Sequence, residues 1–226
     1  MKFVLIRNAA EYQDAITDMF KQLMNNSLKS EVRGTSLIIY YDNYDNEEEL
    51  KEMLYAFENS FMFSIYAYIS GSGDEVRNEK EIAISQKLLD LLPPGVYNFK
   101  SAMLENPRIT CQRDILSFIL EHSSINEEFI KGFVNCDLNV SRASKEMFIH
   151  RNTMMYKLDK LKETSGFDFR SFKDAYILYM LIGGKWAIAN LFDKNCAKCT
   201  YSNVLVLYII ELEKFGGINY GSNWFN

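Results

Sequence analysis

The stretch Leu138–Ser165, LNVSRASKEMFIHRNTMMYKLDKLKETS, decides how the second half of this sequence folds. It predicts two short helices joined by a tight turn, because small and apolar residues recur at helical spacing on both sides of that turn. Each predicted helix therefore has one apolar face that can pack against its neighbour. The first face consists of Val140, Ala143 and Met147, and the second of Met154, Leu158 and Leu161.

Polar residues stand where the two predicted helices begin. Asn139 or Ser141 can cap the first helix, and Asn152 or Thr153 the second, because their side-chain oxygens accept hydrogen bonds from the free N–H groups of a first turn. His150 is predicted either to cap or to pack the turn between the helices.

The turn is apolar where a turn is normally polar. Phe148 and Ile149 occupy it, which predicts a turn wedged between two helices that pack together. Ala143 is small enough to allow a close approach of the second helix. Gly166 follows the last periodic residue and is predicted to end that helix.

The exposed face of the second predicted helix is basic. Leu138–Ser165 contains six basic and three acidic residues, so the segment carries +3, whereas the whole chain carries −5 and the remainder −8. A basic segment in an acidic chain is typical of duplex binding, since phosphate contacts supply most of the non-specific affinity, although charged residues also form ordinary solvated helix faces. The predicted DNA contacts are Arg151 and Asn152 on base edges or nearby phosphates, Thr153 and Tyr156 on the backbone, and Arg142, Lys145, Lys157 and Lys160 on phosphates.

A set of residues in this stretch matches a known pattern. It resembles the C-terminal helix-turn-helix of the PucR/CdaR family of bacterial transcription regulators, over roughly Asp114–Ile182. A looser similarity to the Fis-type helix-turn-helix runs through Asn139, Arg142-Ala143, Ile149, Arg151, Thr153 and Lys157-Leu158. The residues that carry the closer resemblance are Ala143, Phe148-Ile149-His150-Arg151-Asn152-Thr153, Tyr156-Lys157-Leu158, Gly166 and Asp168.

The resemblance implies a sequence-specific DNA-binding regulator whose recognition helix, about 151–164, enters the major groove. As in many helix-turn-helix proteins, a homodimer would place two such helices ~34 Å apart. Two departures from the family pattern are Met155, where a basic residue is usual, and Lys157, where arginine is usual. Methionine makes no ionic contact with phosphate, and lysine lacks the fork that reads guanine.

The first half of the chain alternates strand-like and helix-like patterns. Strands are predicted at 2–7, 36–41, 61–69 and 96–99, helices at 9–25, 46–57 and 79–92, and a polar loop at 26–35. Asn46 with Glu49 forms a capping box for the second of these helices. This alternation predicts an α/β layer domain. The family resemblance further implies a degenerate cyclase-like domain without catalytic residues, serving dimerisation or effector sensing.

The predicted organisation is α+β overall. Residues 1–105 form the α/β domain and 106–184 an all-α DNA-binding domain with its helix-turn-helix at 139–165. Further helices are predicted after Pro107, at 127–135 and at 171–181. The 185–226 tail has no assigned role. Its Cys196 and Cys199 have the spacing of half a zinc site but no second pair, so they are weak metal candidates, and no cofactor is predicted.

Several classes of protein are excluded by what the sequence does not contain. No apolar run approaches the ~20 residues of a membrane span. Four cysteines without a secretion signal predict reduced thiols and a cytoplasmic location. No predicted strand end offers a nucleophile–base set or a glycine-rich phosphate cradle, so an enzyme is not expected. The alternative to a regulator is an acidic protein-interaction adaptor that uses the helical pair without DNA. A small-molecule effector is not identified by the sequence.

Overall fold

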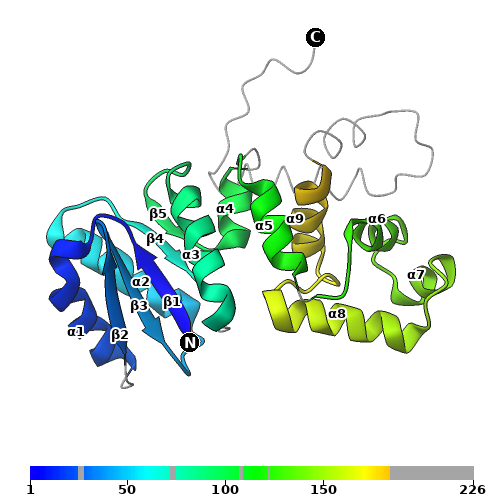
Figure 1. Cartoon of the computed structure of the whole chain (residues 1–226), viewed down its shortest axis with the longest axis horizontal. Coiled ribbons are helices and arrows are strands. Elements are labelled where there is room, and N and C mark those ends of the chain that lie inside the picture. Colours follow the sequence, from blue (N-terminus) through cyan, green and yellow to red (C-terminus); the bar gives the residue numbers. More distant parts are fainter. Residues whose placement is uncertain (25–27, 72–74, 107–108, 122, 184–226) are drawn as a thin grey trace, which may run out of the picture. The chain divides into compact units, whose positions relative to one another are not determined.

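A five-stranded sheet forms the first half of the chain in the computed structural model. Its strands are β1 (Lys2–Ile6), β2 (Lys29–Arg33), β3 (Ser36–Tyr41), β4 (Tyr66–Ile69) and β5 (Gly95–Tyr97), in the order β2-β3-β1-β4-β5 (Figure 1). Strand β1 is antiparallel to both of its neighbours, and β4 pairs with β5 in parallel. The structure describes residues 1–24, 28–71, 75–106, 109–121 and 123–183, and Met1–Ile182 form one compact unit.

Helices cover both faces of this sheet. The elements between the strands are the 3₁₀ turn η1 (Ala10–Tyr12) and the helices α1 (Gln13–Met24), α2 (Glu47–Phe61) and α3 (Glu75–Leu89), with α4 (Phe99–Glu105) after β5. Successive residues of a strand point to opposite faces. Val4 and Ile6 pack with α1 and α2, whereas Phe3 and Leu5 belong to the core under α3 and α4.

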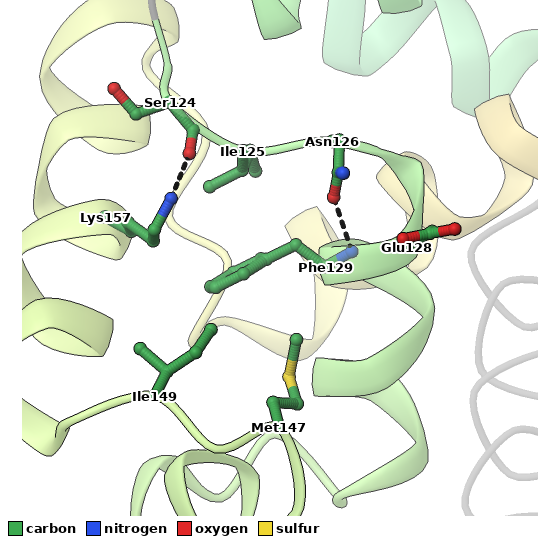
Figure 2. Close-up of a pocket in the computed structure, with 8 residues that line it drawn as sticks. All are labelled: Ser124, Ile125, Asn126, Glu128, Phe129, Met147, Ile149 and Lys157. Atoms are coloured by element: carbon green, nitrogen blue, oxygen red, sulfur yellow. Dashed lines mark hydrogen bonds between the residues drawn. The ribbon is translucent and has the colours of Figure 1, made fainter.

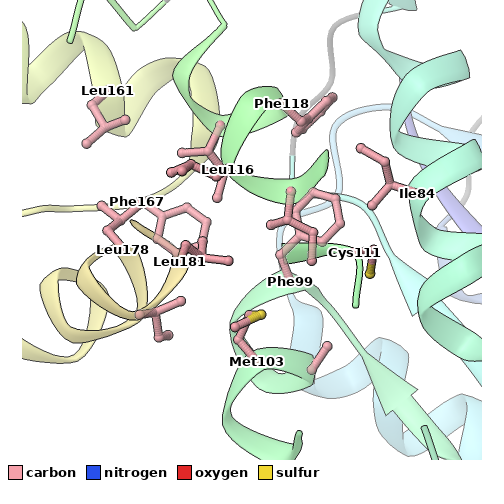
Figure 3. Packing of buried hydrophobic residues seen from close by; sticks show 14 of the residues in the cluster. Ile84, Phe99, Met103, Cys111, Leu116, Phe118, Leu161, Phe167, Leu178 and Leu181 are labelled. Atoms are coloured by element: carbon pink, nitrogen blue, oxygen red, sulfur yellow. The ribbon is translucent and has the colours of Figure 1, made fainter. Parts of the chain in front are cut away.

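The second half of the described chain is helical. The core that begins under α3 continues without interruption through these helices, and Figure 3 shows part of it, from Ile84 and Phe99 to Leu161 and Leu181. The helices are α5 (Gln112–Leu120), α6 (Glu127–Asn135), α7 (Val140–Glu146), α8 (Arg151–Ser165) and α9 (Phe172–Gly183). The fold is therefore α+β, with a sheet region followed by a helical region, as predicted.

Two predicted segments of the sheet region are wrong. The predicted loop at 26–35 contains β2, which pairs with β3 along the sheet edge. Its residues are mostly polar because an edge strand is partly exposed, so no apolar alternation marks it. The predicted strand at 61–69 begins only at Tyr66; Phe61 ends α2, where its ring stacks on Phe57 at 4.3 Å between centroids.

Candidate nucleic-acid interface

Helices α7 and α8 form the predicted helix-turn-helix, and side chains cap both. The Asn139 side chain accepts a hydrogen bond from the Arg142 N–H at 3.0 Å, which confirms it as the cap of α7. The predicted caps of α8, Asn152 or Thr153, are wrong, because the helix already begins at Arg151 and His150 Nδ1 accepts from the Asn152 N–H at 3.2 Å. The prediction that His150 caps or packs the turn is confirmed, because its side chain caps α8.

The Asn139→Ala variant is expected to lower the free energy of unfolding by about 1 kcal/mol, because one first-turn N–H of α7 loses its partner. Urea unfolding of the full chain measures this change. The control is Ser141→Ala, at the other residue proposed as a cap; it should change the free energy of unfolding by less than about 0.5 kcal/mol. An equal loss in both variants would contradict the assignment of the cap.

The buried faces of the two helices are as predicted, but the turn is not. Met154, Leu158 and Leu161 are fully buried, and Ala143 lies buried between the helices. Gly166 ends α8 with a φ of 74°, as predicted. Ile149 packs partly against the core, whereas Phe148 is 96% exposed, so the prediction that both are wedged between the helices is wrong for Phe148.

The start of α8 presents polar side chains to solvent. Arg151, Asn152 and Thr153 are exposed, and Tyr156 is 60% exposed. Lys145, in the last turn of α7, is also exposed. Within the described chain, none of these five side chains has a hydrogen bond or an ion pair. Their polar groups are therefore available to a partner, and binding that partner would break no internal hydrogen bond or ion pair of these side chains.

The other three predicted contacts hold partners within the chain. Arg142 lies 2.6 Å from Asp137 Oδ2 and 2.8 Å from Glu146 Oε1. The Lys157 ammonium donates to the Ser124 carbonyl and Lys160 donates to the Ser124 hydroxyl at 3.1 Å. These two lysines thus fix the α5–α6 connection onto α8, a contact that their spacing did not reveal.

A pocket of about 440 Å³ lies beside α8, between the α5–α6 connection and the α7–α8 turn. Met147 and Ile149 extend into it from the turn, toward the Phe129 ring of α6, as Figure 2 shows. The pocket therefore explains why Met147 and Ile149, the chain neighbours of Phe148, are apolar. Its lining residues are Ser124, Ile125, Asn126, Glu128, Phe129, Met147, Ile149 and Lys157.

Cations from the sheet region hold the other end of α8. The Arg77 guanidinium from α3 donates to the Thr164 carbonyl, and also to the Phe118 carbonyl at 2.6 Å. The Lys100 ammonium from α4 donates to the Gly166 carbonyl at 2.8 Å. The last carbonyls of a helix have no partner within the helix, so these cations satisfy them and suit the negative end of its dipole. No short-range sequence signal connects residues so far apart.

Metal and membrane predictions fall partly outside the described residues. Cys196 and Cys199 lie there, and nothing is assigned to them. Over the ranges that the structure describes, no group of His, Cys, Asp or Glu is arranged to hold a metal ion. The helices of those ranges include none with the length and apolar character required to cross a membrane.

Known proteins resemble parts of this chain that differ in length. The uncharacterized protein YxkF of Bacillus subtilis (strain 168) is 25% identical over 148 residues, which cover 60% of this chain and 50% of that protein. The DNA-binding transcriptional activator AdeR, from the same strain, is 27% identical over 86 residues, 38% of this chain and 18% of AdeR. The carbohydrate diacid regulator of Escherichia coli (strain K12) is 44% identical over 39 residues, 17% of this chain and 10% of that protein. The chain thus spans half or less of the length of these relatives.

The helical region also matches one protein family. The match covers residues 128–182, which contain α7 and α8 and all but one residue each of α6 and α9. The family is described as the PucR C-terminal helix-turn-helix domain. Residues 128–182 therefore form a PucR-type C-terminal helix-turn-helix domain.

Proposed function

We propose that this chain is a sequence-specific transcription regulator that binds double-stranded DNA as a homodimer, with α8 in the major groove. The observation that carries this proposal is the exposed start of α8, where the side chains of Arg151, Asn152 and Tyr156 have no hydrogen-bond or ion-pair partner within the described chain. Recognition helices contact base edges through their first turns. AdeR, which is similar to 38% of this chain, is named a DNA-binding transcriptional activator.

The exposed residues divide by chemistry into two roles. Arg151 and Asn152 can form paired hydrogen bonds with guanine or adenine edges. Thr153 and Tyr156 carry hydroxyl groups that can donate to phosphate oxygens. Lys145, in the last turn of α7, supplies a positive charge. The base contacts select the sequence, whereas the phosphate contacts set the orientation of α8 on the duplex.

The three cations with internal partners also belong to the proposed phosphate contacts. Arg142 pairs with carboxylates that are about half exposed. Exposed ion pairs contribute only about 0–1 kcal/mol, so a phosphate can replace them at small cost. Lys157 and Lys160 bind one residue, Ser124, and exchange of those bonds for phosphate would free the α5–α6 connection.

We assign the other parts of the chain supporting roles. Residues 1–105 form a non-catalytic domain for dimerisation or effector sensing, and residues 106–184 form the DNA-binding domain. A regulator of this kind works where the chromosome is, in the cytoplasm of a bacterium. The sheet and helical regions share a core, so a signal in one has a physical route to the other.

Selection of bound fragments from random duplex DNA tests the function directly. We expect a defined sequence to be enriched, and its affinity to fall steeply as salt is added, because binding releases counterions from the phosphates. An adaptor that uses the helical pair for protein contacts would enrich no sequence. Absent or salt-insensitive binding by the full chain would reject the proposal in favour of that adaptor.

The Arg151→Ala variant is expected to bind the selected duplex about 5- to 150-fold more weakly, the range for loss of one base contact. If Arg151 instead contacts phosphate, the loss will be similar for all sequences and the salt slope will fall by about 1. Fluorescence anisotropy at several salt concentrations separates the two. Arg113→Ala is the matched control, since Arg113 is also exposed and has no side-chain partner within the described chain, but lies on α5.

A further inference from the structure

Phe148 is unfavourable both in its exposure and in its backbone conformation. Its ring is 96% exposed, so it gains nothing from burial. Its φ is 53°, a left-handed conformation that is unfavourable for a bulky side chain and favours glycine. Residues that violate local rules without a structural gain occur mainly at functional sites. The structure therefore directs attention to what covers this ring when the protein acts.

The position of Phe148 limits what can cover it. Its chain neighbours Met147 and Ile149 both extend into the pocket against α6, whereas Phe148 contributes nothing to that pocket. It precedes Arg151 by three residues, so the two Cα atoms are at most about 11 Å apart. That distance is comparable to the width of a major groove, about 12 Å. A duplex that receives the start of α8 therefore lies within reach of the ring.

We infer that Phe148 makes an apolar contact with the 5-methyl group of a thymine at the edge of the site read by α8. This inference rests on the proposed DNA binding and adds a residue that determines its specificity. The thymine methyl is the one apolar group that bases present in the major groove, and phenylalanine is among the side chains that contact it. An aromatic ring has no ionic attraction for phosphate, and wedges between base pairs act from the minor groove, which α8 does not enter.

The test compares Phe148→Gly with the full parent chain on the selected duplex. Glycine accepts the left-handed backbone, so the midpoint of thermal unfolding should stay the same or rise, while affinity for DNA falls about three- to tenfold. The slope of affinity against salt should not change, because no phosphate contact is lost. Phe148→Leu, which keeps an apolar group, should restore part of the affinity.

Uracil substitution locates the contact. Replacing thymine with uracil removes only the methyl group; at one position this should weaken the parent chain, whereas Phe148→Gly should lose nothing further. Met62→Gly is the matched control, because Met62 is 95% exposed with a φ of 52° but lies at the end of α2. It should leave DNA affinity unchanged.

Three results would overturn the inference while leaving DNA binding intact. The first is equal affinity of the parent chain and Phe148→Gly for the selected duplex. The second is a ratio of affinities, parent chain to Phe148→Gly, that is the same on every uracil-substituted duplex as on the thymine duplex. The third is a change in oligomeric state of Phe148→Gly, measured by sedimentation without DNA, which would assign the ring to a second copy of the chain. Failure of the parent chain to bind any duplex would instead reject the proposed function itself.

Discussion

The Glu81→Gln variant is expected to gain about 3 kcal/mol of stability relative to the parent chain as the pH rises from below 4.5 to above 7. Glu81 lies fully buried on α3, and burial raises the pKa of its carboxyl from 4.5 to about 7. One oxygen accepts from the Tyr68 hydroxyl at 2.8 Å and the Gly71 N–H at 3.1 Å, while the other has no partner. Glutamine retains the accepting oxygen and carries no charge.

The sign of the pH dependence follows from the raised pKa. Between about pH 4.5 and pH 7 the folded chain holds a proton on Glu81 that the unfolded chain has released, so the free energy of unfolding falls as the pH rises through this window. Above about pH 7 this contribution is constant. Urea unfolding of parent and variant from pH 4 to pH 8 measures the difference between them, which removes the contribution of other groups.

Glu79→Gln is the control on the same helix. Hydrogen bonds from Arg33 hold the pKa of Glu79 below its usual value, so its contribution is present at neutral pH and is lost as the pH falls. The two variants should therefore differ from the parent chain with opposite signs. A flat difference between Glu81→Gln and the parent over the whole range would show that Glu81 titrates normally and that its burial is not maintained in solution.

The Arg77→Met variant is expected to lower the free energy of unfolding by about 2–4 kcal/mol, because one buried carbonyl, of Phe118, and one partly buried carbonyl, of Thr164, lose a charged donor. Arg77 is 3% exposed and its guanidinium lies 4.2 Å from the centre of the Phe118 ring. Methionine preserves the apolar stem but neither hydrogen bond. Since one of those bonds holds the last turn of α8, affinity for the selected duplex should also fall.

A second variant and a double mutant distinguish charge from packing at this site. Arg77→Lys retains the charge but not both hydrogen bonds, and should lose less stability than Arg77→Met. Arg77 also stabilises the ionised form of Glu81, so Arg77→Met should cost more at pH 8 in the parent chain than in Glu81→Gln. Equal costs in both backgrounds would mean that the two side chains act independently.

Much of the helical region could be predicted from sequence because its signals are local. The α6 range, 127–135, was predicted to the residue, since apolar residues recur in it at helical spacing; the structure adds that Asn126 caps it. The α8 stripe of Met154, Leu158 and Leu161 was predicted for the same reason. Strand β2 was missed because its edge position leaves it polar, and edge strands carry no periodic pattern that distinguishes them from a loop.

Local sequence was sufficient to predict the two-helix unit, its apolar faces, a cap at Asn139 or Ser141 and the end at Gly166, because each depends on residues within a few positions of one another. Which side chains of that unit are available to a partner depends on the rest of the fold. In the folded chain, Lys157 and Lys160 donate hydrogen bonds to Ser124, and Phe148 is exposed. Arg77 of α3 donates a hydrogen bond to the end of α8. These properties could not be predicted, because exposure, partners and buried charge depend on residues distant in the chain, which are brought together by packing and not by sequence spacing.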